Sequence, residues 1–249
     1  MFVKDRTFSG VVCEQRVYFV SDRILNIKTA EPSRPRFKTE EERFRHRWRM
    51  ARRKHVQLFN ENFSPTSLYS TLTFDDEHEV HTFKEARKIR DNYYKRLKYY
   101  YPDSIIFLYM GRGKSTNRIH FHMVSEGIPQ DVIENQWYYG DIKRIVNLRK
   151  KNYYEGKYCG QDYTGLANYL FDHWTKEQGG HYYKKSKNAK KPEREAPVEC
   201  IRRYSEDKPP RPPKGYIFVE SRATEFGYLY FKYIKDTRKS DKKNCKDSS

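Results

Sequence analysis

The chain has 249 residues, enough for one domain of about 150 to 200 residues with extensions, whereas two full domains would be a tight fit. Its 51 lysines and arginines against 33 acidic residues give a formal charge of +18, which favours a polyanionic partner, with nucleic acid as the leading candidate. There is no apolar run of bilayer length, no signal-peptide pattern and no CxxC pair, which argues against a membrane span, a zinc ribbon and a disulfide framework, and we expect a cytoplasmic protein.

The first part of the chain, residues 1–65, is expected to form an N-terminal extension with a basic helix. Thr39 opens a capping box, and the stretch 43–54 that follows contains seven lysines and arginines and no acid. Like charges at this density repel one another unless an anion lies nearby, so we expect phosphate contacts, notably from Arg47 and Arg52. The alternative is a solvated face.

Residues 66–235 are expected to form the main domain, which begins with six elements in the order βαββαβ. The strands are expected near 68–74, 104–110, 118–126 and 142–148, and the helices near 82–101 and 129–137. Thr82 and Glu85 fit a capping box at the start of the first of these helices. This order predicts an α+β fold of the split βαβ, ferredoxin-like type, an antiparallel sheet with helices on one face. A helix near 164–174 and two strands near 215–220 and 228–234 follow. The polar end, 236–249, is expected to be a disordered basic tail.

Two histidines in the strand 118–126 carry the first chemical signal. His120 and His122 flank Phe121, and because side chains alternate along a strand, both imidazoles point to the same face. With a third ligand such a pair can bind Mn²⁺, Mg²⁺ or Zn²⁺, although imidazole suits Mn²⁺ better than Mg²⁺. The alternative is two half-buried histidines hydrogen-bonded to their neighbours.

A helix farther along the chain supplies the second signal. Asp172, His173 and Lys176 lie at i+3, i+4 and i+7 from Tyr169, so all four can share one face. A tyrosine so placed can act as a nucleophile on phosphorus, or it can simply belong to the core. Tyr163 is the rival nucleophile.

The third metal ligand stays open at this point. His173 is the favoured candidate because it lies one turn beyond Tyr169 on the same side of the helix. Asp172 is the harder, oxygen-bearing alternative, and solvent or a distant carboxylate is the remaining one. Glu126 has the parity of the histidine pair but lies too far along the strand.

Basic residues surround these two signals. Arg112, Lys114 and Arg118 lie in and beside a hairpin loop, where Gly111 and Gly113 would let the backbone approach a phosphate closely. The alternative is an ordinary flexible hairpin.

The run 181–191 interleaves aromatic rings with cations, the combination that a groove for single-stranded nucleic acid requires. Its candidate contact residues are Lys184, Lys185 and Lys187. A solvated loop is the alternative reading of this run.

The order of these motifs resembles a known family. TLTF at 71–74, HFH at 120–122 and the Tyr169 helix resemble the three motifs of HUH endonucleases, specifically the rolling-circle replication initiators of plasmids, phages and mobile elements of Gram-positive bacteria. The resemblance covers residues 66–235. Many relatives carry lysine at i+3 from the tyrosine, where this chain has Asp172 and places Lys176 a turn later.

The resemblance implies an HUH endonuclease fold and a single-tyrosine nickase. Tyr169 would be the nucleophile, assisted by Lys176, and the cofactor would be Mn²⁺ or Mg²⁺. The partner would be single-stranded DNA at a replication origin, and because the sequence has no Walker A motif, a separate host helicase would unwind the duplex. A relaxase, a single-tyrosine transposase and a non-catalytic module that binds single-stranded nucleic acid are the alternatives. Oligomeric state has no signal in the sequence.

Overall fold

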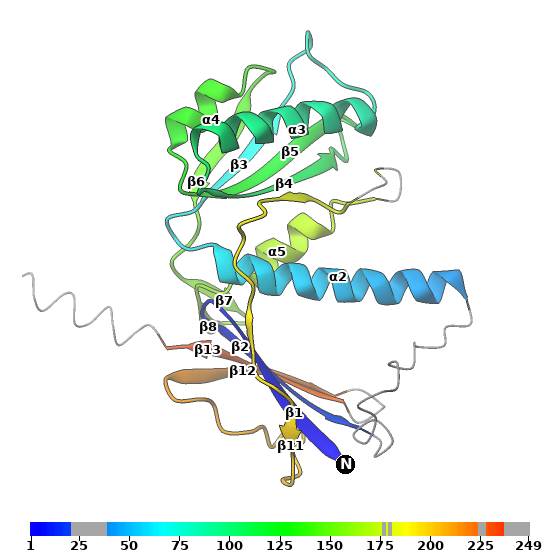
Figure 1. Ribbon diagram of the computed structural model, residues 1–249, viewed down its shortest axis with the longest axis vertical. Helices are drawn as coiled ribbons and strands as arrows, with labels where there is room; N and C mark the ends of the chain where they lie inside the picture. The colour runs from blue at the N-terminus through cyan, green and yellow to red at the C-terminus, as the bar shows by residue number, and fades with distance from the viewer. Residues whose placement is uncertain (21–38, 176–177, 179–180, 224–227, 237–249) are drawn as a thin grey trace, which may run out of the picture. The chain divides into compact units, whose positions relative to one another are not determined.

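The computed structural model describes residues 1–20, 39–175, 178, 181–223 and 228–236, and it shows an α+β protein with antiparallel sheets (Figure 1). The chain divides into two compact units. The first unit contains residues 1–57, 151–162 and 192–249, and the second contains residues 58–150 and 163–191. Each unit is described by itself below.

This division differs from the expected one, which set residues 1–65 apart from a single domain at 66–235. Strand β2 (Val12–Phe19) pairs with β13 (Leu229–Lys235), so segments from the two expected regions share one sheet. The expected tail begins at Asp236, and its residues 237–249 lie outside the described part of the chain.

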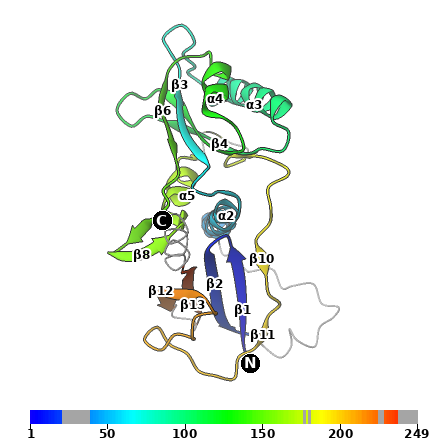
Figure 2. The ribbon, with the colours of Figure 1, turned by 90° about the vertical axis from the view of Figure 1, so that its left-hand side faces the viewer.

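The first unit is built on an antiparallel sheet with the strand order β10-β1-β2-β13-β12, and β11 also pairs with β1 (Figure 2). Its other strands are β1 (Phe2–Ser9), β10 (Glu193–Arg194), β11 (Val198–Glu199) and β12 (Tyr216–Ala223). Gly10, with φ of 57°, makes the tight turn between β1 and β2. A separate hairpin joins β7 (Asn152–Tyr154) to β8 (Lys157–Gly160).

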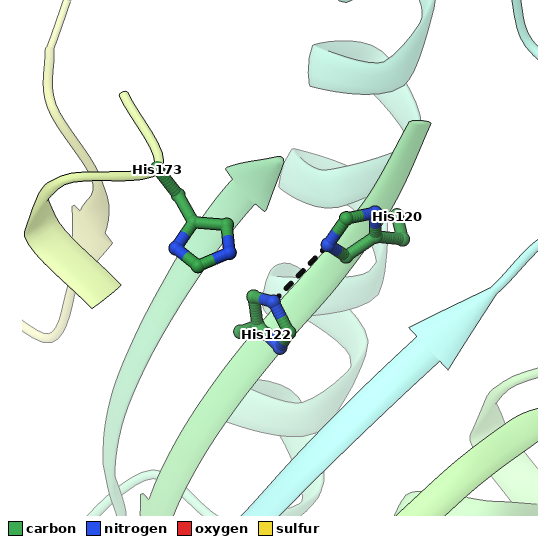
Figure 3. Close-up of side chains that lie close together, drawn as sticks. All are labelled: His120, His122 and His173. Carbon is green, nitrogen blue, oxygen red and sulfur yellow. Dashed lines mark hydrogen bonds between the residues drawn. The ribbon is translucent and has the colours of Figure 1, made fainter. Parts of the chain in front are cut away.

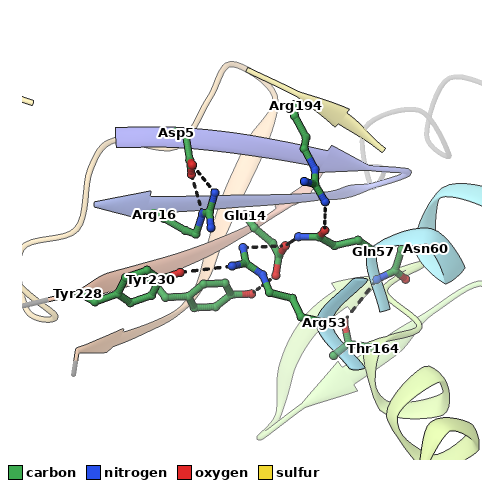
Figure 4. Close-up of polar contacts among 10 residues, drawn as sticks. All are labelled: Asp5, Glu14, Arg16, Arg53, Gln57, Asn60, Thr164, Arg194, Tyr228 and Tyr230. Atoms are coloured by element: carbon green, nitrogen blue, oxygen red, sulfur yellow. Dashed lines mark hydrogen bonds and ion pairs between the residues drawn. The ribbon is translucent and has the colours of Figure 1, made fainter. Parts of the chain in front are cut away.

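Helix α2 (Glu40–Asn62) begins at the expected capping box, because the Glu42 backbone N–H donates to the Thr39 hydroxyl over 3.1 Å. Near the end of the basic stretch of this helix, the Arg53 guanidinium forms an ion pair with the carboxylate of Glu14 on β2, with 3.4 Å between nitrogen and oxygen (Figure 4). The buried Glu14 carboxylate also accepts hydrogen bonds from Gln57 and, over 2.8 Å, from Tyr230. Part of the basic helix therefore neutralises a buried acid of the first unit.

The second unit contains a five-stranded antiparallel sheet with the order β6-β3-β5-β4-β9. Its strands are β3 (Leu68–Thr73), β4 (Ile105–Arg112), β5 (Ile119–Glu126), β6 (Ile142–Asn147) and β9 (Lys184–Lys185). Helix α3 (Phe83–Tyr100) connects β3 to β4, and α4 (Gln130–Gln136) connects β5 to β6. The four longer strands and two helices have the expected split βαβ order.

Helices α3 and α4 cover one face of this sheet (Figure 1). Alternate strand residues such as Leu72, Leu108 and Phe121 are fully buried against the apolar side of α3. The capping box predicted at Thr82 and Glu85 is present in both directions and fixes the start of that helix.

The opposite face of the sheet lies toward helix α5 (Thr164–Phe171), which differs from the expectation of helices on one face only (Figure 1). Two of the remaining alternate positions of β4 carry the buried rings of Phe107 and Tyr109, and burying these rings requires a cover on this side. Phe107 contacts Phe59 and Phe63 at the end of α2, and Tyr183 stacks on Tyr109 with ring centroids 5.3 Å apart. Asn60 anchors α5 by accepting the backbone N–H of Tyr163 over 2.8 Å.

Helices of the described residues contain no segment that is both long and apolar enough to cross a membrane.

Candidate metal centre

Three imidazoles gather on the face of the second unit's sheet that lies toward α5 (Figure 3). His120 and His122 project from β5, and His173 follows the end of α5. Their candidate ligand nitrogens all lie within 4.8 Å of one another, and Nε2 of His120 is 3.1 Å from Nε2 of His122. His120 and His122 point to the same face of the sheet, as their alternation predicted, and the structure brings His173 to them.

The sheet makes room for this cluster at Gly111 on β4. Gly111 lies opposite His120 in the strand register, and a Cβ atom there would be 2.9 Å from His120 Nε2 and 2.8 Å from His173 Cδ2. Both distances are shorter than ordinary van der Waals contact. Glycine therefore allows the rings to lie against the sheet, a role different from the phosphate approach that the sequence suggested.

Hydrogen bonds orient two of the imidazoles through the nitrogen that faces away from the cluster. Tyr69 on β3 places its hydroxyl 2.8 Å from Nδ1 of His122, and the Thr71 hydroxyl lies 3.2 Å from the same nitrogen. Nδ1 of His173 lies 2.8 Å from the backbone oxygen of Tyr169, to which it can donate. Partners of this kind fix the tautomer of a metal-binding histidine and leave Nε2 as the ligand atom.

Burial keeps the strand histidines neutral. Removal from water, reinforced by the neighbouring imidazoles of His120 and His173, lowers the pKa of His122 from 6.5 to about 3. Burial also lowers the pKa of His120, which a hydrogen bond with the backbone of Arg118 partly opposes. At neutral pH these rings therefore carry lone pairs that a cation can use.

Tyr169 lies beside the three histidines and is open to solvent. Its ring centroid is 4.4 Å from that of His173 and 5.9 Å from that of His122, and 53% of the residue is exposed. The rival Tyr163 is only 3% exposed, donates its hydroxyl to the backbone oxygen of Arg149 over 3.1 Å, and has its pKa raised by burial. Tyr169 is thus the one of this pair that a large substrate can reach.

The other residues considered for the centre lie apart from it or outside the described chain. Asp172 is exposed at the C-terminal cap of α5 and is not a member of the cluster found among the described residues. Glu126 accepts hydrogen bonds from the hydroxyls of Ser67 and, over 2.9 Å, Thr66. Lys176 lies outside the described residues.

The arginines of the β4–β5 hairpin are engaged within the protein. Arg112 donates to the backbone oxygen of Asn117 over 3.0 Å and lies 5.0 Å from the centroid of the Phe83 ring. Arg118 pairs with Asp76 over 3.0 Å and with Glu79 over 3.2 Å. Lys114 is exposed at the tip. Of the three basic residues of the hairpin, Lys114 is therefore more accessible to a phosphate than the two arginines.

The predicted lysines after α5 lie at the edge of the same sheet. Lys184 forms a 3.6 Å ion pair with Asp91 of α3, on the side away from the histidines. Lys185 pairs in register with Phe107, so its exposed side chain has the parity of the histidine face. Lys187 is exposed as well.

The two arginines singled out on α2 differ in exposure. Arg47 is exposed, and Arg52 is half-buried. Both belong to the part of the helix assigned to the first unit.

Tyr69 is the site residue that the sequence did not single out. Its signal was the shared parity of Tyr69 and Thr71 in the strand that contains the TLTF motif. The contact also depends on the pairing of β3 with β5, which places Thr71 opposite His122.

The fold and the centre together define an α+β protein with a three-histidine site that can bind a metal ion beside an exposed tyrosine. Comparison with family models, with curated proteins and with solved structures finds no match.

Proposed function

We propose that the protein is a single-tyrosine DNA nickase with an HUH endonuclease fold. The observation that carries this proposal is the exposed Tyr169 ring, 4.4 Å from His173 in a cluster of three imidazoles. A net charge of +18 suits a polyanionic substrate, and the order of the motifs resembles that of rolling-circle initiators.

The donor set of the centre fits a divalent transition metal. Three imidazole ligands suit Mn²⁺ better than Mg²⁺, which prefers oxygen ligands, and the described residues add no carboxylate to the cluster. We therefore propose Mn²⁺ as the cofactor, held by His120, His122 and His173. A cation bound there would act as a Lewis acid on a non-bridging phosphate oxygen.

The role of Tyr169 in this proposal is that of the nucleophile. Its phenolic oxygen forms a bond to the scissile phosphorus, the bond from phosphorus to the 3′ oxygen breaks, and the DNA 5′ end remains attached to the protein as a phosphotyrosine. The phenol gives up its proton and the departing 3′ oxygen gains one. Rejoining reverses these steps and conserves the energy of the phosphodiester bond.

The proposed biological context is the start of rolling-circle replication. The substrate would be single-stranded DNA at an origin, and a separate helicase would supply the unwound strand. This part of the proposal is supported by the resemblance of the 71–74, 120–122 and 169 motifs to those of replication initiators.

The test is covalent capture of DNA by the full chain. A pool of fluorescent single-stranded oligonucleotides derived from the element that encodes the protein is incubated with Mn²⁺, and the product is analysed on a denaturing gel. We expect a labelled protein band that disappears in Tyr169→Phe and on addition of EDTA. A labelled band that survives in Tyr169→Phe would remove this residue from the mechanism.

Two further tyrosines serve as controls. Tyr138→Phe changes a ring that is likewise exposed, at 56%, and that lies 4.5 Å from the Arg96 guanidinium on α3. Tyr163→Phe removes the hydroxyl of the buried rival. Both variants should still form the adduct, and its loss in Tyr163→Phe alone would transfer the role of nucleophile to Tyr163.

A further inference from the structure

The first unit contains a cluster of positive charge that includes no residue of the metal centre. A cavity of about 410 Å³ opens beside β1 and β2 and the segment 202–211. Among the described residues that line it, none is an acid and six are cations: Lys4, Arg6, Arg202, Arg203, Lys208 and Arg211. None of these was singled out from the sequence.

Most of these cations have no anionic partner within the described part of the chain. Arg6 is an exception, because its guanidinium forms a long ion pair of 3.9 Å with the partly exposed carboxylate of Glu195. Arg6 also donates a hydrogen bond to the side chain of Gln15 over 3.0 Å. No ion pair among the described residues involves the other five cations. Unrelieved repulsion among several cations around one cavity favours binding of an anion.

The two acids within the segment 202–211 do not neutralise the cavity. Glu206 is held by the backbone, since its carboxylate accepts the N–H of Ala223 over 2.6 Å. Asp207 is exposed and lines no part of the cavity.

The cavity wall is tied to the sheet at several points. Strand β11 pairs with β1, and the Cys200 N–H donates to the backbone oxygen of Phe2 over 2.9 Å. At the other end of the segment, the buried Tyr233 hydroxyl donates to the backbone oxygen of Pro210 over 3.0 Å. These bonds fix the backbone that carries the arginines, so less ordering is needed when a ligand binds.

Exposed aromatic rings continue the same face of the sheet. Phe2, Lys4 and Arg6 alternate along β1 and therefore point to one side. Phe2 is 47% exposed, and Phe19, its partner on β2, is 61% exposed, with the two ring centroids 5.6 Å apart. Proteins bind single-stranded nucleic acids with exposed rings, on which the unpaired bases stack, and with neighbouring cations, which contact the phosphates.

We propose that this surface of the first unit binds single-stranded DNA, with phosphates in the cavity and bases against Phe2 and Phe19. The choice of DNA rather than RNA rests on the proposed function. Binding itself requires neither the metal nor Tyr169, so this surface would hold a strand whether or not it is cut.

The experiment measures binding without cleavage. The Tyr169→Phe chain in EDTA is titrated with a fluorescein-labelled 15-nucleotide oligothymidine, and fluorescence anisotropy is recorded from 50 to 300 mM salt. In this background, Arg202, Arg203 and Arg211 are replaced together by glutamine. The matched control replaces three cations of the same unit that do not line the cavity, Lys151, Lys214 and Lys235, by glutamine as well.

The cavity variant should lose at least tenfold in affinity at 100 mM salt, and its slope of log affinity against log salt should fall by about 2, since each phosphate contact to a single strand contributes about 0.7. The control should lose less than threefold. Phe2→Ala with Phe19→Ala should lose about fivefold or more with an unchanged slope, because stacking releases no counterions. Thermal unfolding of each variant checks that the fold is intact.

Equal losses in the cavity variant and the lysine control would overturn the proposal, as would duplex DNA binding with the same dependence on the three arginines. If binding to phosphatidylserine vesicles requires these arginines while oligonucleotide binding does not, the surface binds membranes and the DNA site is rejected. Formation of the covalent DNA adduct is measured separately, in the chain that retains Tyr169. Its absence would defeat the nickase while leaving arginine-dependent binding as evidence for this surface.

Discussion

Replacing Gly111 by alanine should damage the metal centre while leaving the fold of the second unit largely intact. The added Cβ would lie 2.8 Å from His173 Cδ2 and 2.9 Å from His120 Nε2, so at least one ring must withdraw by roughly half an ångström to restore ordinary contact. Ligand distances in metal sites are held to within about 0.2 Å. The displacement is therefore larger than a bound ion tolerates.

Two magnitudes follow from that overlap. Overpacking of this kind costs about 1–3 kcal/mol, which urea unfolding of the metal-free Gly111→Ala protein should detect. The affinity for Mn²⁺, measured by isothermal titration calorimetry, should fall at least tenfold. Co²⁺ binding, followed by visible absorption, should report altered ligand geometry.

A matched glycine is available on the helix that precedes His173. Beyond its chain neighbours and its own helix backbone, no atom of the described residues lies within 4 Å of a Cβ added at Gly165. Gly165→Ala should therefore leave Mn²⁺ affinity unchanged and stabilise the helix by about 0.5–1 kcal/mol. If Gly111→Ala binds Mn²⁺ as tightly as the unaltered chain while His122→Ala does not, the argument from close packing is refuted. If neither change affects binding, the three histidines do not hold the ion.

Three further predictions concern orientation, protonation and a buried charge. Tyr69→Phe removes the hydroxyl that lies 2.8 Å from Nδ1 of His122, and calorimetry should show Mn²⁺ binding weakened about 10- to 100-fold. The free energy of unfolding should change little. Unchanged Mn²⁺ affinity would show that Tyr69 does not orient the ring. Because His122 has a pKa of about 3 when folded and about 6.5 when unfolded, the folded state binds fewer protons, so in EDTA the free energy of unfolding should fall by about 2 kcal/mol from pH 7 to pH 5. Urea titrations should show a smaller fall in His122→Asn, and an equal fall would assign the pH dependence to other groups. Asp162→Asn leaves the nearly buried Lys232, 2.5 Å away, without its carboxylate and should cost about 3–5 kcal/mol in urea unfolding, whereas a loss below 1 kcal/mol would show that water solvates the lysine there.

The second unit could be predicted from the sequence because its signals are local. Alternation in β5 placed His120 and His122 on one face, and the Thr82 capping box located the start of α3. Such patterns depend on neighbours within a few residues. The order of strands and helices predicted the antiparallel sheet of this unit, since a split βαβ unit permits few arrangements.

The first unit could not be predicted in the same way. Its sheet requires Val17 to pair with Leu229, more than two hundred residues later in the chain, and nothing in either strand specifies that partner. The cations of the cavity are dispersed through the sequence for the same reason. Lys4 and Arg211 share a cavity only after the sheet and the segment 202–211 have formed.

The centre was predictable up to its third ligand. His173 and Asp172 are adjacent, and helical spacing allowed either to reach the strand pair. Helix α5 ends at Phe171, with Asp172 exposed at the cap and His173 held by the backbone oxygen of Tyr169. The direction of the chain at a helix end decides the matter, and that direction depends on tertiary packing.

The second unit lies within the sequence of the first, and this has a consequence for synthesis on the ribosome. All of its strands and helices have been made once Lys191 has emerged, so it can fold while β12 and β13 are still missing. The β1–β2 hairpin, which is made before the second unit, must wait for β13 to cover the free edge of β2. A lone hairpin is marginally stable, and an uncovered strand edge can pair with another chain. Between the synthesis of β2 and that of β13, the uncovered edge of β2 therefore exposes the nascent chain to aggregation through this hairpin.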